Sequence, residues 1–147
     1  MRSDSGQVLA FFALVLQIVL LPVAAYAVDA AVISTRASEL QAATAQAAET
    51  AAQRVSIGDL RSSGAFVLDQ NGARVAAVET MSEEDPGAAL VSVSINDATI
   101  TLMTSETMSV PFNLFGGPVT LRSRASARIA AGYDSPSSRL PLPTRTF

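Results

Sequence analysis

The sequence predicts an α+β protein in which one long N-terminal helix, membrane-embedded in its first half, precedes a small antiparallel β-sheet. Three observations predict this fold class. Residues 8–28 form an uncharged apolar run, and an Ala-rich helical pattern continues from there to about residue 54. From residue 56 onward, Gly, Pro and Asn-Gly turn signals separate short stretches in which apolar and polar residues alternate.

The composition leaves few side chains for catalysis or ligand binding. The 147 residues include no Cys and no His, and all ten basic residues are Arg. No side chain can therefore act as a thiolate, an imidazole or a primary amine. We expect no enzyme activity, no cofactor, no metal site and no small-molecule substrate. The net charge of −3, without a basic patch, argues against a nucleic-acid partner.

The N-terminal segment predicts a membrane topology. Residues 1–6 are a short polar leader that carries Arg2, and positive charge tends to stay on the cytoplasmic side. As a helix, residues 8–28 would be about 31 Å long, which matches the hydrocarbon core of a bilayer. We expect a single-pass protein of the cytoplasmic membrane with its N-terminus inside and its C-terminus outside.

The apolar run has two alternative fates. As a secretory signal peptide it would end at an A-x-A cleavage site formed by Ala25 and Ala27. As a retained membrane helix it would tolerate Pro22 as a kink. The local pattern leaves both fates open, but the helical pattern continues through Asp29 without a break, which favours retention.

We expect the helix to cover residues 7–55 and to pack through a narrow stripe in its second half. Mostly small side chains recur there at steps of three and four, while polar residues occupy the other faces. Gln17 lies near the middle of the apolar run, and we expect it to hydrogen-bond across helices in an assembly. The stripe consists of Val32, Ile33, Ala37, Leu40, Ala43, Ala47, Ala51 and Val55.

The order of these elements resembles the TadE/TadG-like family, the minor pilins or pseudopilins of the tight-adherence (Flp, type IVc) pilus system. The resemblance covers about residues 5–53. It rests on Gly6-Gln7 before the apolar run, on Ala-Val-Asp at residues 27–29, and on the Leu-Gln-Ala-Ala sequence that follows Arg36. A pilin-like outline, with a long helix lying on a small sheet, is the fold that the resemblance implies.

The resemblance also implies a processing site and partners. A prepilin peptidase would cut between Gly6 and Gln7, and the partners would be the membrane and other pilin or pilus-assembly subunits. The chain departs from the pattern at Phe11, where many pilin-type sequences carry Glu. It also has Pro22, whereas the family often has Pro at the position of Gln17.

The remainder of the chain predicts an extracytoplasmic domain of antiparallel strands over residues 56–133. Asp69–Gly72 and Asn96-Asp97 are hairpin-turn signals. The last expected strand alternates over a long span, so its odd-numbered residues share one face. We expect four or five strands, drawn from residues 65–68, 74–78, 90–95, 98–103 and 119–129.

Three segments without strand character complete the chain. Residues 108–118 form a loop in which Phe112 and Phe115 either contact a partner or plug the edge of the core. The acidic residues 83–85 are too few and too close together for a calcium site, so a solvated loop is expected. Residues 134–147 are rich in Pro, Ser and Arg and are predicted to be disordered.

These observations favour a structural role. The leading hypothesis is a minor pilin or pseudopilin-like subunit of a Tad (Flp) pilus or related secretion apparatus, anchored by its N-terminal helix and able to enter a surface filament. The alternative is a secreted or surface adhesin-like β module, released by signal peptidase after Ala27.

Overall fold

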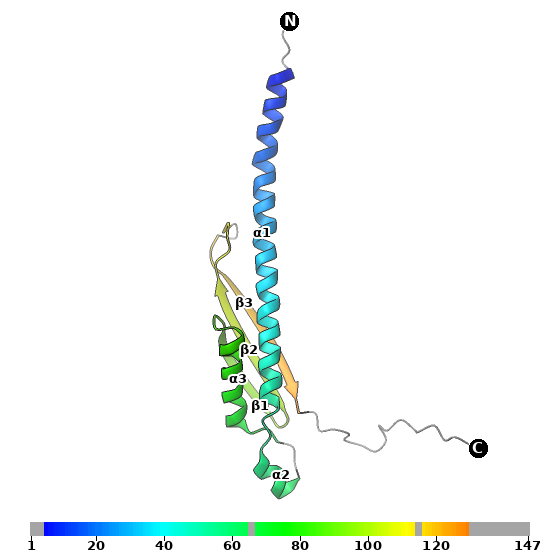
Figure 1. Ribbon diagram of the computed structural model, residues 1–147, viewed down its shortest axis with the longest axis vertical. Helices are drawn as coiled ribbons and strands as arrows, with labels where there is room; N and C mark the ends of the chain where they lie inside the picture. Colours follow the sequence, from blue (N-terminus) through cyan, green and yellow to red (C-terminus); the bar gives the residue numbers. More distant parts are fainter. Residues whose placement is uncertain (1–4, 65–66, 114–115, 130–147) are drawn as a thin grey trace, which may run out of the picture.

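The computed structural model describes residues 5–64, 67–113 and 116–129, and it has the expected α+β layout (Figure 1). One long helix passes along one face of a small antiparallel sheet, and a second helix packs beside it. In chain order the elements are α1 (Ser5–Ala52), α2 (Ile57–Ser63), α3 (Gln70–Glu84), β1 (Ala89–Asn96), β2 (Thr99–Met108) and β3 (Val119–Arg128).

Helix α1 is continuous over 48 residues, although Pro22 lies inside it. At about 1.5 Å per residue it is about 70 Å long, roughly twice the length of a bilayer core. Its N-terminal half projects away from the rest of the chain, and its C-terminal half packs against α3, β2 and β3 (Figure 1). The helix ends three residues before the predicted boundary, because Val55 pairs instead with Leu68 in an isolated antiparallel bridge.

The sheet has the order β1-β2-β3, and both pairs of neighbours are antiparallel. The turn predicted at Asn96-Asp97 is confirmed: Asn96 pairs with Thr99, and Asp97 has the positive φ of 50° that such tight turns require. In β3 the odd-numbered residues are buried or half-buried and the even-numbered ones are exposed, as its alternation predicts. The described residues form three strands rather than four or five.

The missing strands are explained by α3, where the prediction from sequence is wrong. The predicted strand 74–78 lies inside this helix, and the predicted hairpin turn at Asp69–Gly72 is its start. Of the predicted strand 65–68, residues 65 and 66 lie outside the described residues, and Leu68 makes the single bridge to Val55. The domain after residue 56 is therefore part helix and part sheet.

Local chemistry explains why this segment is helical. Asp69 is the N-cap, and its Oδ1 accepts a hydrogen bond of 3.1 Å from the backbone N–H of Asn71. The cap needs Gly at position 72, because a Cβ there would lie 2.7 Å from Asp69 Oδ2. Small residues at helical spacing then form the buried side of the helix, namely Ala73, Ala76, Ala77, Thr80 and Met81.

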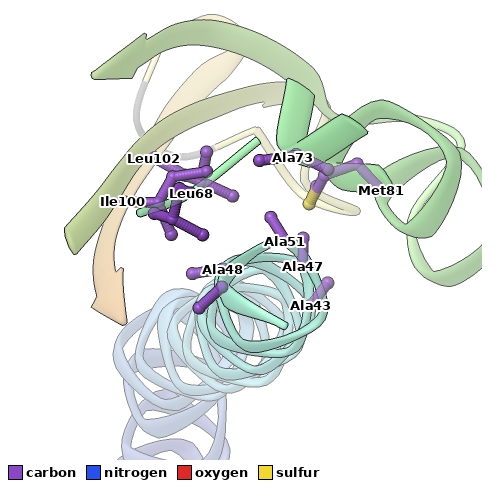
Figure 2. Packing of buried hydrophobic residues seen from close by; sticks show 11 residues of the cluster. Ala43, Ala47, Ala48, Ala51, Leu68, Ala73, Met81, Ile100 and Leu102 are labelled. Atoms are coloured by element: carbon purple, nitrogen blue, oxygen red, sulfur yellow. The ribbon is translucent and has the colours of Figure 1, made fainter. Parts of the chain in front are cut away.

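The core lies where α1, α3 and the inner face of the sheet meet. Figure 2 shows Ala43, Ala47 and Ala51 on the side of α1 toward Met81 of α3, and Ala48 on the side toward the sheet. Short side chains on both helices allow a close approach, while the larger residues come from the sheet side. The largest of these are Ile100 and Leu102, neither of which has any exposed surface, and Leu68.

Candidate functional site

The projecting half of α1 is the most unusual surface of the described chain. Every described side chain from Val8 to Ala24 is exposed, although this segment is almost entirely apolar. The helix is long and apolar enough to cross a membrane, and its most apolar stretch packs against nothing within the described chain. A core helix of a water-soluble domain would bury such a stretch, so this half of α1 needs lipid or another protein to cover it.

Small residues gather on one side of this projecting half. Ala10, Ala13 and Ala24 lie on one face together with Gln17 and Leu20, at steps of three and four, and all five are exposed. The sheet and α3, against which the C-terminal half of α1 packs, are called the body here. At about 100° per residue, these side chains lie about half a turn away from Leu40 and the other residues that α1 buries against the body. The small stripe therefore points away from the sheet, and bulky residues such as Phe12 and Val19 occupy other faces.

The predicted processing residues all lie on α1. Gly6 and Gln7 fall in its first turns, because the helix begins at Ser5. Ala25 is half-buried and Ala27 is exposed, and the helix continues through both without interruption. Nothing in the described geometry separates a leader or a released segment from the rest of the helix.

The exposed half of α1 ends at Asp29, which has no exposed surface. Its Oδ1 accepts a hydrogen bond of 2.9 Å from the backbone N–H of Phe112 in the β2–β3 loop. Asp29, the first charged residue after the apolar run, thus connects α1 to the β2–β3 loop through a hydrogen bond. Phe112 itself keeps 56% of its surface exposed, and its predicted companion Phe115 lies outside the described residues.

The predicted packing residues of α1 lie along its contact with the body. Leu40, Ala47 and Ala51 are buried, and Ala37 is half-buried. Between them the buried Thr44 donates a hydrogen bond of 2.6 Å to the backbone oxygen of Leu40. Because that bond uses the only hydroxyl proton of Thr44, the second bond of 2.6 Å, to Thr104 of β2, has Thr104 as its donor.

Closer to the apolar half of α1, the contact between the helix and the sheet is made by charged side chains. Arg36 donates a hydrogen bond of 2.8 Å to Glu39, and its other terminal nitrogen lies 3.5 Å from Glu106 Oε1 on the inner face of β2. The bond to Glu39 and the charge of Glu106 both raise the pKa of Arg36 above its ordinary value. Arg36 is therefore charged at any physiological pH and neutralises part of the acidic charge around it.

Two buried carboxylate oxygens near Arg36 have no hydrogen-bond partner among the described residues, namely Glu106 Oε2 and Asp85 Oδ2. The other oxygen of Asp85 accepts a bond of 3.2 Å from the Gly87 N–H. A Cβ at Gly87 would lie 3.5 Å from Asp85 Oδ1 and also 3.5 Å from Glu106 Oε1, so the two carboxylates are near neighbours. Within the described part of the chain, no three acidic, His or Cys side chains are placed to hold a metal ion.

Sequence reasoning did not single out Thr44, Thr104 or Glu106, and it gave Asp29 no contact with the rest of the chain. It expected residues 83–85 to form a solvated loop, which is wrong, because α3 extends to Glu84 and Asp85 is buried. A signal existed for Asp29 and Glu106. Asp29 precedes Ile33 by four residues and so falls on the same stripe as the packing residues. Glu106 falls in the apolar phase of its strand, two and four residues after Thr104 and Leu102.

Comparisons of the chain with family models, with curated proteins and with solved structures found no match.

Proposed function

We propose that the protein is a structural, minor pilin or pseudopilin-like subunit of a Tad (Flp) pilus or related secretion apparatus, as in the TadE/TadG-like family that its N-terminal sequence resembles. One observation carries the proposal. A single unbroken helix is exposed and apolar in its first half and buried against a helix–sheet body in its second half. In such a subunit, the apolar half of the helix is covered by lipid or by other proteins and not by the subunit's own body.

Those surroundings would change during the life of the subunit. Before assembly, residues 8–28 lie in the cytoplasmic membrane, with the N-terminus inside and the body outside. After assembly, the same surface packs against helices of neighbouring subunits. Both environments are apolar, so the transfer needs no refolding of the helix, and close helix packing can compensate for lost lipid contacts.

The orientation of the small stripe supports this role. Ala10, Ala13, Gln17 and Ala24 face away from the side of α1 that carries the body, as judged by the helical repeat. Helices that meet through this stripe approach closely and leave their bodies on the outside. A helical centre surrounded by exposed sheets is the arrangement that a filament of such subunits requires.

Cysteine cross-linking in membranes tests the proposal, because the chain contains no Cys of its own. Single substitutions Ala13→Cys and Ala24→Cys report on the small stripe, and Val15→Cys and Val19→Cys report on another face as matched controls. The substituted chain is produced together with the other pilus components and then treated with an oxidant. We expect disulfide-linked species at positions 13 and 24 and much weaker linkage at 15 and 19.

Equal linkage on both faces would mean that the helices meet by random collision, and the assembly role would fail. Release of a soluble protein that begins at Val28 would support the alternative of an adhesin-like module freed after Ala27. The unbroken course of α1 across Ala25, Ala27 and Asp29 supports retention over release.

A further inference from the structure

The loop between β2 and β3 lies beside α1 at the level where the apolar half of the helix ends (Figure 1). The hydrogen bond of 2.9 Å from the Phe112 N–H to Asp29 Oδ1 fixes it there. Asp29 is fully buried, so this bond is shielded from competing water. The position of Phe112 along the helix axis is therefore defined by the position of Asp29.

Helix geometry converts that position into a depth relative to a membrane. Residues 8–28 cover about 31 Å, which the hydrocarbon core of about 30 Å just accommodates. If this stretch spans the bilayer, Asp29 lies at the boundary between acyl chains and headgroups on the outer side. Phe112 is bonded to Asp29 and lies at the same boundary.

The surface of the loop has the chemistry that this boundary favours. Phe112 is 56% exposed, its neighbours Pro111 and Asn113 are exposed, and the sequence from 107 to 121 contains no charged residue. Tyr26 lies on α1 three residues before Asp29, hence on the same side of the helix, and is also 56% exposed. Aromatic side chains concentrate at membrane–water interfaces, where an apolar ring can sit beside polar headgroups.

The end of the body far from the membrane has a different character. The short helix α2 lies beyond the C-terminal end of α1 and carries Asp59 and Arg61. The β1–β2 turn contains Asp97. The uncharged, aromatic surface of the loop is thus found at the end of the body that faces the bilayer, and the charged contact of Arg36 with Glu106 lies two helical turns further along α1, away from the bilayer.

We propose that residues 111–113 of the β2–β3 loop form a second membrane contact, in which Phe112 inserts into the headgroup region of the outer leaflet beside α1. The occupant of this surface is the phospholipid bilayer itself, and the proposal rests on the anchoring of residues 8–28 proposed above. A single helix leaves the body free to rotate about the helix axis and to tilt. A second contact point to one side of the axis restrains both motions and presents the sheet in one orientation.

Tryptophan fluorescence tests this proposal in the full chain, which contains no Trp. Phe112→Trp reports on the loop and Ile18→Trp on the centre of the apolar run. Ile57→Trp is the matched control, because Ile57 is 63% exposed but is the first residue of α2, which lies at the far end of the body. Each variant is placed in vesicles of phosphatidylcholine and phosphatidylglycerol that contain lipids brominated either near the headgroup or near the acyl-chain end.

We expect the Phe112→Trp variant to lose more emission to the shallow bromines than to the deep ones. In vesicles it should also emit at shorter wavelength than the Ile57→Trp variant. The Ile18→Trp variant should lose more emission to the deep bromines, and the Ile57→Trp variant should lose none to either. Circular dichroism confirms that each variant is folded. If Phe112→Trp disturbs the fold, Pro111→Trp reports on the same loop.

The outcomes separate the two proposals. An unquenched Phe112→Trp variant together with a quenched Ile18→Trp variant would overturn the loop contact while leaving the membrane anchor intact. Emission from the Phe112→Trp variant that is blue-shifted but unquenched would show that protein covers the loop, which would also overturn the contact. An unquenched Ile18→Trp variant would refute the anchor itself, and the loop proposal would fail with it.

Discussion

Replacing Ala47 with Leu should destabilise the body by overfilling the contact between α1 and α3. Ala47 has no exposed surface, and Figure 2 places it on the side of α1 toward Met81. Ala73 and Ala77 of α3 belong to the same cluster and are also fully buried, so Met81 is the only long side chain of α3 in this cluster that could move aside. Three added carbon atoms must push α3 outward or adopt a strained rotamer.

Overpacking of this kind costs about 1–3 kcal/mol in a well-packed core. For a domain of roughly 100 residues, each kcal/mol lowers Tm by about 4–8 °C, so we expect a decrease of about 4–24 °C. Ala42→Leu is the matched control because it makes the same change on the same helix at an exposed position. It should change the free energy of unfolding by only a few tenths of a kcal/mol.

The assay is thermal unfolding of the full chain in detergent micelles, followed by circular dichroism and by resistance to a protease. Proteolysis is the cleaner readout, since the micelle can keep the apolar half of α1 helical after the body has unfolded. Equal Tm values for Ala47→Leu and Ala42→Leu would refute the close packing of α1 on α3. A lower Tm for Ala42→Leu alone would mean that the helix faces the body with another side.

Three further outcomes are expected. Thr44→Val should lower the free energy of unfolding by about 1–3 kcal/mol, because it leaves the buried Thr104 hydroxyl without an acceptor for its proton. Thr104→Val should lower it by only about 0.5–1.5 kcal/mol, because Thr44 keeps its bond to Leu40. Equal losses in thermal unfolding would contradict this assignment of donor and acceptor. Gln17→Leu should weaken self-association in a membrane two-hybrid assay by about 0.6–2 kcal/mol without reducing insertion, and unchanged association would make Gln17 a lipid-facing residue. Intact mass and membrane fractionation should find a membrane-bound chain with or without residues 1–6, whereas a soluble chain starting at Val28 would replace the pilin-like role with the adhesin-like one.

The long helix and all three strands of the sheet could be predicted because their patterns are long and regular. The stripe that contains Leu40, Ala47 and Ala51 keeps helical spacing over many turns, and no competing signal interrupts it. The hairpin of β1 and β2 has alternating strands on both sides of a short turn at Asn96-Asp97. In each case the local preference and the tertiary packing agree.

Helix α3 was missed because its signals conflict. The dipeptide Asn71-Gly72 is a strong hairpin signal when alternating residues flank it, and Arg74–Val78 contains two Val residues that favour strands. The structure uses Gly72 for a different reason, which is close approach of the Asp69 side chain that caps the helix. The burial of Ala73, Ala76 and Ala77 then follows a helical repeat that a window limited to the short stretch 74–78 does not reveal.

The contacts around the site were beyond sequence reasoning because they join residues far apart in the chain. The bond between Asp29 and Phe112 spans 83 residues, and that between Thr44 and Thr104 spans 60. Each depends on the axial position of the sheet on α1, which no local pattern specifies. The exposed apolar half of α1, by contrast, could be predicted from residues 8–28 alone.

The two ends of the contact between α1 and the body differ in kind, and the difference explains how the body is positioned. Toward the C-terminal end of α1, Ala47 and Ala51 belong to a cluster with Leu102 and other apolar residues, a type of contact that stabilises without fixing a bond direction. Nearer the apolar half of α1, the contacts of Thr44 with Thr104 and of Asp29 with Phe112 are directional and form at one axial position only. A shift of β2 by one residue would also turn the Thr104 side chain to the opposite face of the sheet. The polar contacts therefore set the height of the β2–β3 loop on α1, and with it the depth at which Phe112 would meet the bilayer.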